Sequence, residues 1–307
     1  MSLKFTAVSL GECVSISGLS ESNLAVGKRW TFNPRGSTAA SERAFVYSDG
    51  VPTGIDVGPC FNSQATAVGA GNIIVGTGTN PNMFGVFGWV EENGVVTRLD
   101  GLGGSNVMPA STNGKVHAGS ANLPSRVGRA VKWENGQCID LGTVGGPAST
   151  GSAINNNGSV TGASRARTQN MQMVAFLHKD GKMTALPGLS ENLSSWGYGI
   201  NDNDEVVGMS QGPSGNTAVK WVKGKPVSLC SGSAFDINNN GFVVGSAGNP
   251  GFAFLHDGTS LYNLNDITEG LDGVVLQSAN RINEQGCVAA VGFDKNARLR
   301  GYILLPV

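Results

Sequence analysis

Short runs of apolar and polar residues, separated by turns, make up almost the whole chain. Residues 44–47, 86–89 and 130–133 are such runs, and most of them are followed by an Asn-Gly or Asp-Gly pair. These pairs supply the positive φ angles of a tight hairpin turn. No segment has the apolar period of a helix over about 11 or more residues. The pattern therefore predicts an all-β chain of short antiparallel strands.

An internal repeat organises these strands. Its landmark is an apolar residue, an Asn-rich turn, two or three apolar residues and a glycine, as in residues 154–162, 200–208 and 237–245. The last position of the landmark recurs at intervals of 37 to 49 residues, at Gly27, Gly76, Gly119, Gly162, Gly208, Gly245 and Ala290. Each unit contains four short strands, and four strands per 40–45 residues are typical of a β-propeller blade.

The two ends of the chain complement each other. The seventh unit stops after its third strand, at residues 301–307, whereas residues 5–11 resemble the fourth strand of another unit, residues 139–142. Pairing of the two ends would remove a free sheet edge. We therefore predict a single domain, residues 1–307, that is a seven-bladed β-propeller with four antiparallel strands per blade. The N-terminal strand, about residues 4–11, completes the blade formed by about residues 276–307.

The repeat motifs Ile-Asn-x-x-Gly-x-Val-x-Gly and Ala-Phe-x-Trp resemble the HAF repeats of many bacterial proteins, often predicted to be extracellular. The resemblance covers essentially the whole chain and implies a propeller fold without implying an activity. The family's nominal His before Ala-Phe is absent, since the equivalent residues are Arg43, Gly85, Arg129, Val174, Thr217, Phe252 and Arg300. No apolar stretch follows Lys4 as in a signal peptide, so a cytoplasmic location is expected.

Composition narrows the function classes. The 307 residues include 21 Lys and Arg against 22 Asp and Glu, and this near-neutral balance gives no signal for nucleic acid. No apolar run reaches the roughly 18 residues of a membrane span. The five cysteines have no CxxC spacing, which predicts neither a zinc site nor a disulfide framework. A bond between Cys13 and Cys60 is left open.

The basic residues concentrate in the loops between the second and third strands of each unit. These loops hold 11 of the 21 basic residues and 2 of the 22 acidic ones, whereas acidic residues crowd the turns expected at the opposite face. Arginine binds carboxylates and phosphates through a planar fork, and exposed aromatics beside it are common at interfaces. The candidate partner-binding residues are Arg29, Trp30, Arg35, Arg43, Arg129, Arg165, Arg167, Arg298 and Arg300.

Motifs for catalysis or metal binding are incomplete. Residues 208–212 match the nucleophile-elbow string but follow a repeat strand. Residues 236–241 begin like a calcium loop, but Ala247 replaces the closing acid. His178 and His256 occupy positions where other units have Trp, and the Asn-rich turns are expected only to close hairpins. We therefore expect no cofactor, no metal and no catalytic residues.

The leading hypothesis is a non-enzymatic binding propeller that presents an arginine-bearing face to an acidic protein or another anionic partner. One alternative is a lectin, lyase or hydrolase for acidic glycans that works at the axial funnel, with Tyr198 or His117 as a candidate base. Another alternative is a structural assembly module. The oligomeric state is left open.

Overall fold

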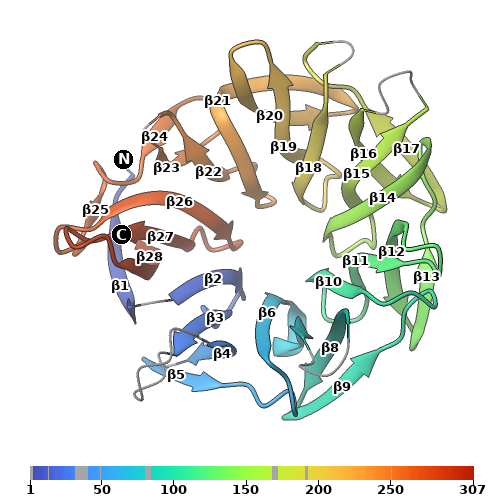
Figure 1. The fold of residues 1–307 in the computed structure, drawn as a ribbon. Coiled ribbons are helices and arrows are strands. Elements are labelled where there is room, and N and C mark those ends of the chain that lie inside the picture. Colours follow the sequence, from blue (N-terminus) through green and yellow to red (C-terminus); the bar gives the residue numbers. More distant parts are fainter. Residues whose placement is uncertain are drawn as a thin grey trace.

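The computed structural model describes residues 3–12, 14–31, 41–48, 50–79, 84–167, 172–190, 193–249 and 251–307. Within these ranges the chain forms β-strands and one short 3-10 helix, η1 (Ala70–Asn72), and no α-helix. The strands belong to six hydrogen-bonded sheets. The sheets stand side by side around a central axis, in the order of the chain (Figure 1). The predicted all-β class is therefore confirmed.

Four of the sheets are antiparallel meanders of four strands in chain order. The first two comprise β2 (Val14–Leu19), β3 (Ala25–Thr31), β4 (Ser41–Ser48) and β5 (Val51–Gly54), followed by β6 (Asn62–Val68), β7 (Ile74–Thr79), β8 (Val86–Glu92) and β9 (Val95–Leu99). The next two comprise β10 (Val107–Thr112), β11 (His117–Asn122), β12 (Gly128–Glu134) and β13 (Gln137–Asp140), followed by β14 (Gly145–Ile154), β15 (Val160–Ala166), β16 (Met173–Lys179) and β17 (Lys182–Leu186).

A seven-stranded sheet follows, and one long strand runs through its middle. Its strands are β18 (Ser195–Ile200), β19 (Val206–Gly212), β20 (Gly215–Val222), β21 (Lys225–Ile237), β22 (Val243–Ala247), β23 (Phe252–His256) and β24 (Leu261–Asn263). The first half of β21, up to Ser231, pairs with β20, and the second half, from Gly232, pairs with β22. One strand is thus the outer strand of one meander and the inner strand of the next.

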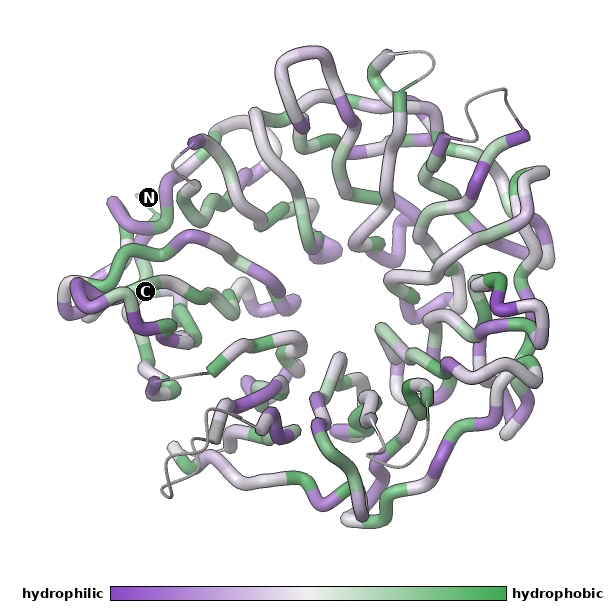
Figure 2. The backbone as a smooth tube through the Cα atoms, in the orientation of Figure 1, coloured by the Kyte–Doolittle hydropathy of each residue, from purple (hydrophilic) through white to green (hydrophobic). Residues whose placement is uncertain are grey.

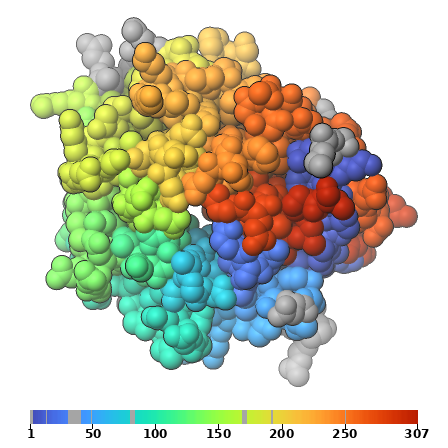
Figure 3. All heavy atoms as spheres, turned by 180° about the vertical axis from the view of Figure 1, so that it is seen from behind, coloured from blue at the N-terminus to red at the C-terminus, as the bar shows by residue number. Residues whose placement is uncertain are grey.

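The remaining sheet joins the two ends of the chain. It contains β25 (Thr268–Glu269), β26 (Val275–Ile282), β27 (Val288–Phe293) and β28 (Leu299–Pro306), together with the N-terminal β1 (Phe5–Glu12). Strand β1 pairs antiparallel with β28, from Phe5 opposite Pro306 to Glu12 opposite Arg300. Seen from behind, the C-terminal residues lie against the N-terminal ones (Figure 3). This is the pairing of the two ends that the repeat pattern predicts.

The apolar core is divided among the interfaces between neighbouring sheets. Apolar positions recur along the strands throughout the ring (Figure 2). One cluster packs Leu255 and Leu264 against Leu276, and another packs Val26 against Trp89. Burial of such side chains contributes about 1.5–3 kcal/mol each, so every sheet depends on its neighbours for stability.

A chain of asparagines links the Asn-rich turns of successive sheets. Each turn asparagine donates its side-chain N–H to the first backbone carbonyl of the next turn, over 2.9–3.2 Å. The donors and acceptors follow one another as Asn113, Asn155, Asn201, Asn238, Asn283 and Ser20. Because the turns contact one another, they all lie at one end of the ring, the turn face.

The same asparagines also shape their own turns. Asn155 Oδ1 accepts the backbone N–H groups of Asn157 and Ser159, at 3.1 and 2.9 Å. The expectation that the Asn-rich turns only close hairpins is therefore wrong, because one amide side chain closes its turn and bridges to the next sheet. In the β6–β7 turn the equivalent residue is Gly69, which has no side chain to make this bridge.

Candidate functional site

The described strand ends and loop residues that carry predicted arginines lie opposite the turn face, at an end of the ring that we call the loop face. The strand ends flank the points where the second and third strands of a meander follow each other in the sequence, for example β3 and β4 or β15 and β16. The links from one sheet to the next end at the same face, because four antiparallel strands return the chain to the side where it started. Loops that sit on a rigid β scaffold commonly carry function.

Arg29 and Arg43 lie directly opposite each other on β3 and β4, and both are exposed. Arg43 donates to the carbonyl of Phe61, the residue before β6, whereas the side chain of Arg29 has no hydrogen-bond or ion-pair partner among the described residues. Trp30 is half-buried beside Lys28, whose Nζ lies 5.0 Å from the ring centroid and 2.7 Å from Glu42. Arg35 lies outside the described residues.

Arg165 and Arg167 extend from the end of β15 and are both exposed. Neither guanidinium group has a hydrogen bond or ion pair with any residue that the structure describes. Arg126, in the neighbouring β11–β12 connection, is also exposed and adopts a left-handed conformation with φ of 67°. These three guanidinium groups stay in water and are available to an external anion.

Arg129 is half-buried on β12, and its Nε has no hydrogen-bond partner within the described chain. Its ion pair with Asp140 is long, at 3.9 Å. Asp140 ends β13, so the carboxylate comes from a link between sheets. An acidic residue of the loop face thus partly neutralises this arginine.

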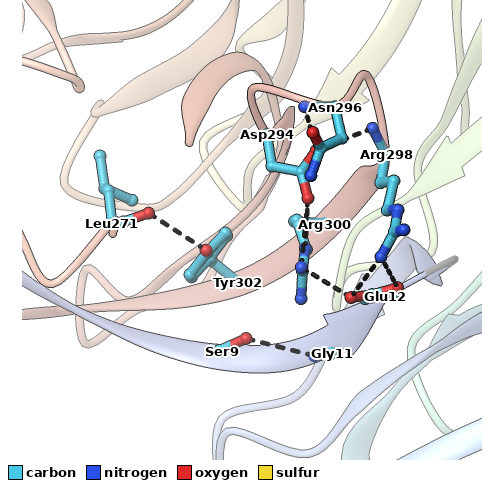
Figure 4. Close-up of polar contacts among 9 residues, drawn as sticks. All are labelled: Ser9, Gly11, Glu12, Leu271, Asp294, Asn296, Arg298, Arg300 and Tyr302. Carbon is cyan, nitrogen blue, oxygen red and sulfur yellow. Dashed lines mark hydrogen bonds and ion pairs between the residues drawn. The ribbon is translucent and has the colours of Figure 1, made fainter. Parts of the chain in front are cut away.

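Arg298 and Arg300 are tied to the joint between the two ends of the chain (Figure 4). Arg300 contacts Glu12 of β1 at 2.7 Å and Asp294 at 3.1 Å, and Arg298 reaches Glu12 at 3.3 Å. The backbone N–H of Arg298, followed by that of Asn296 and the Arg300 guanidinium, lowers the pKa of Asp294. Both arginines therefore bind carboxylates of this protein that stabilise the joint between the two chain ends, which leaves them less available to an external anion.

The predicted one-sided charge is consequently weaker than the loop sequences indicate. That expectation counted only the connections within each meander. Glu12 and Asp140 enter the loop face from the links between sheets, and Glu42 binds Lys28 within its own meander. Among the described residues, the exposed arginines without a carboxylate partner are those on β3, β4 and β15 and in the β11–β12 connection, together with Arg98 on β9. The guanidinium of Arg98 stacks over the Phe87 ring, 3.8 Å from its centroid.

A second feature, absent from the sequence predictions, is a ring of β-bulges around the axis. Every innermost strand has one extra residue opposite the same position of its partner strand, as between Gly197 and Gly199 against Gly208 and Val207. We call the extra residues the bulge ring; they are Ser17, Thr66, Ala110, Ser152, Tyr198, Phe235 and Asn280. All are half-buried. Bulges re-aim side chains next to functional sites.

In six of the seven units a repeat glycine stands opposite the start of the bulge, and in the seventh the equivalent residue is Ala290. A Cβ at Gly162 would overlap the carbonyl oxygen of Thr150, and a Cβ at Gly208 would overlap that of Trp196. At these glycines the inner strand therefore approaches its partner too closely for a side chain. Tyr198 comes ten residues before Gly208, and Phe235 comes ten residues before Gly245. The offset is ten residues in six of the seven units and nine for Ala110 before Gly119, so it locates each bulge only once the pairing of the strands is known.

The bulge ring lines an axial cavity of about 800 Å³. The cavity reaches the loop face, because its wall includes Ser15 near the start of β2, Asn62 at the start of β6 and Thr79 at the end of β7. Cavities of about 300–1,000 Å³ are typical of sites for small molecules. The axis of the ring is therefore a second candidate site.

The cavity has one aromatic side and one polar side. Tyr198 and Phe235, from adjacent inner strands, place their ring centroids 6.0 Å apart with the planes tilted by 47°. Burial raises the pKa of Tyr198, which keeps its hydroxyl protonated at neutral pH. Ser17 and Gln64 lie on the other side of the ring, on β2 and β6. Such a wall fits a ligand with one apolar face and several hydroxyl groups.

The charged groups at the axis are already engaged. Arg281 donates to the carbonyl of Asn280 at 2.8 Å and stands close enough to oppose the rise in the pKa of Asp236. That rise comes from burial, and Asp236 also accepts the Ile282 N–H at 3.0 Å. The cavity therefore offers mainly neutral hydroxyl and amide groups.

Other candidate chemistry finds no assembled site within the described residues. No group of three or more His, Cys, Asp and Glu side chains there could hold a metal ion. Half-buried His117 contacts Thr112 Oγ1 at 2.8 Å and does not line the cavity. Cys60, Cys138, Cys230 and Cys287 are free thiols. Cys13 lies outside the described residues. None of the helices in these ranges has the length and apolarity that crossing a membrane requires.

Comparisons with known proteins identify the architecture. No protein-family model matches the sequence, and no curated protein sequence matches it. The β-propeller domain of the trilobed protease from Pyrococcus furiosus is similar, with a TM-score of 0.66, 9% identity, and coverage of 98% of this chain and 95% of that one.

Two peptidases are also similar in structure. Pyrococcus horikoshii acylaminoacyl peptidase matches with a TM-score of 0.60 and 10% identity over 98% of this chain. A Mycobacterium tuberculosis puromycin-hydrolyzing peptidase matches with a TM-score of 0.51 and 13% identity over 94% of this chain. This chain spans about half the length of each peptidase, 51% and 50%. At such identities the likeness concerns the fold alone, and the chain has a β-propeller fold.

Proposed function

We propose that this propeller is a non-enzymatic binding protein whose loop face holds an acidic segment of a partner protein. The observation that carries the proposal is the set of exposed arginines without a carboxylate partner. Arg165 and Arg167 are the most accessible, and Arg126 is close to them in the chain order of the sheets. Exposed guanidinium groups attract carboxylates over a distance and bind them bidentately on contact.

The proposal includes a single domain of seven blades. The six sheets become seven blades when β21 is divided at Ser231, where its pairing passes from β20 to β22. The spacing of 37 residues between Gly208 and Gly245 supports this division, because no loop is needed between the two halves. We also keep the assignment to the HAF-repeat proteins as part of the proposal.

A charge reversal tests the loop face. The double variant Arg165→Glu/Arg167→Glu is compared with Lys223→Glu/Lys225→Glu, which makes the same charge change at exposed residues of a turn on the opposite face. Binding of a fluorescent Glu-rich peptide is measured at low salt. We expect about a tenfold or greater weakening for the arginine variant, and little change for the lysine variant.

The salt dependence of the same binding gives the decisive comparison. If arginines of the loop face hold the peptide, affinity falls steeply between low and physiological salt in the wild type and less steeply in Arg165→Glu/Arg167→Glu. Equal weakening in both double variants would mean that net charge alone acts, and the loop-face proposal would be abandoned.

A further inference from the structure

The axial cavity is independent of the arginines on which the proposed function depends. Its wall is built from the bulge ring, which recurs at one position of every inner strand. A bulge weakens strand pairing locally, so its repetition around the axis needs a reason. The extra residues are directed at the cavity, since all of them belong to its wall.

Several polar groups of this wall are unused by the fold. The side chains of Ser15, Ser17, Gln64 and Ser152 and the hydroxyl of Tyr198 line the cavity without a hydrogen-bond partner among the described residues. By contrast, Thr66 donates to the Pro109 carbonyl at 2.8 Å and Asn280 donates to the Ile16 carbonyl at 2.9 Å. Water fills the hydrogen-bonding capacity of the unused groups until a ligand replaces it.

The wall selects against a charged ligand. Arg281 donates to the Asn280 carbonyl at 2.8 Å and its charge acts on the nearby Asp236, and Glu42 binds Lys28 at 2.7 Å. A ligand anion would therefore compete with bonds inside the protein, whereas a neutral hydroxylated ligand meets unused groups. Burial of a charge without a partner costs more than burial of a hydrogen-bonded hydroxyl.

We propose that the axial cavity binds a neutral saccharide, with one face of the sugar ring against Tyr198 and Phe235 and its hydroxyl groups toward Ser17 and Gln64. The faces of aromatic rings carry negative potential, which complements the electropositive C–H groups on one face of a pyranose. The hydroxyl edge of the same sugar meets neutral donors and acceptors. The bulge ring therefore serves as the recognition element, and the loop-face arginines do not take part.

Titration calorimetry with neutral and acidic sugars tests this proposal. The probes are glucose, galactose, mannose, N-acetylglucosamine, maltose and cellobiose, with glucuronate and galacturonate as charged counterparts. Starch and chitin fragments distinguish a free sugar from the end of a polymer. We expect a neutral probe to bind with a Kd below about 10 mM and more tightly than its acidic counterpart.

Matched variants locate the site. Loss of the aromatic ring in Phe235→Leu is expected to weaken binding roughly tenfold, and loss of the hydroxyl alone in Tyr198→Phe should weaken it less. Phe84→Leu removes an aromatic ring that is fully exposed outside the cavity wall and should leave binding unchanged. Thermal melting of each variant without sugar verifies its folding.

Three results would overturn the inference: no neutral probe binds, only the acidic probes bind, or Phe235→Leu binds as the wild type does. Arg165→Glu/Arg167→Glu separates this site from the proposed function. That variant should retain sugar binding while it loses the acidic peptide.

Discussion

Replacement of Asn155 by alanine tests whether the turn asparagines hold neighbouring sheets together. The side chain is buried, donates to the Asn201 carbonyl at 2.9 Å and to Asp204 Oδ1 at 3.0 Å, and accepts two N–H groups of its own turn. Alanine leaves the buried Ser159 N–H without its partner, and it removes one of two donors to the Asn201 carbonyl, which still accepts the Asp204 N–H at 3.1 Å. An unpaired buried group costs about 1–3 kcal/mol and each other lost hydrogen bond about 0.5–1.5 kcal/mol, so we expect a loss of about 2–5 kcal/mol in the free energy of unfolding.

Two further variants separate the parts of this effect. Asn157→Ala removes an exposed side chain that donates once, to the Asp202 carbonyl at 2.8 Å, and should cost about 0.5–1 kcal/mol. Asn155→Asp keeps the acceptor of the turn but loses the bridging donor and places a carboxylate beside Asp204. It should therefore be at least as unstable as Asn155→Ala at pH 7, and recover partly when the new carboxylate is protonated near pH 4.

Urea unfolding followed by tryptophan fluorescence and by circular dichroism provides the measurement. Coincident curves from the two signals are required before a free energy is derived from either. If Asn155→Ala unfolds within about 0.5 kcal/mol of Asn157→Ala, the bridge between the sheets contributes nothing measurable, and the argument from buried partners is wrong.

Other consequences of the structure are open to simple measurements. Gly162→Ala should lower the thermal midpoint by at least several degrees, because its Cβ would overlap the Thr150 carbonyl, whereas Gly54→Ala, with open space around it, should change little; equal midpoints would contradict the close approach. Burial raises the pKa of the Cys138 and Cys230 thiols to about 11, so only about 0.1% of each is thiolate at pH 8. Alkylation of these two cysteines should therefore be slow until urea unfolds the protein. Fast labelling of the folded protein would contradict this expectation. Burial lowers the pKa of His178, so this histidine binds a proton more readily in the unfolded chain, and the free energy of unfolding should fall as the pH drops below about 6.5. The variant His178→Phe should show a smaller fall. An unchanged dependence of stability on pH in this variant would exclude His178 as the cause.

Local turn chemistry made the units of the fold predictable from the sequence. Asn93 and Gly94 adopt positive φ angles of 53° and 81°, as an Asn-Gly hairpin requires. The strands on either side, β8 and β9, pair antiparallel as expected. These features depend on neighbours in sequence, and the residue pattern therefore contains the information that fixes them.

Features that depend on neighbours in space were missed. The bulge at Tyr198 arises because Gly208 lets the inner strand approach, and the repeat glycine alone does not reveal which residue is displaced. The ion pairs of Arg300 with Glu12 require the two chain ends to meet. Sequence reasoning placed Arg300 correctly at the loop face but assigned its charge to an external partner.

The asparagine chain around the turn face has a gap with a mechanical consequence. Ser20 occupies the bridging position of the β2–β3 turn, and among the described residues its side chain bonds only within its own turn, to Ser22 and the Leu24 N–H. The described parts of the β2–β3 and β6–β7 turns are joined instead by Ser22 and Asn72, through one exposed hydrogen bond of 3.4 Å. The sheets that meet at this seam also supply Ser17 and Gln64 to the axial cavity. The ring is therefore weakly joined at one seam, and that seam extends to the axial cavity. A ligand that binds both Ser17 and Gln64 would connect the two sheets across it and stabilise the closed ring.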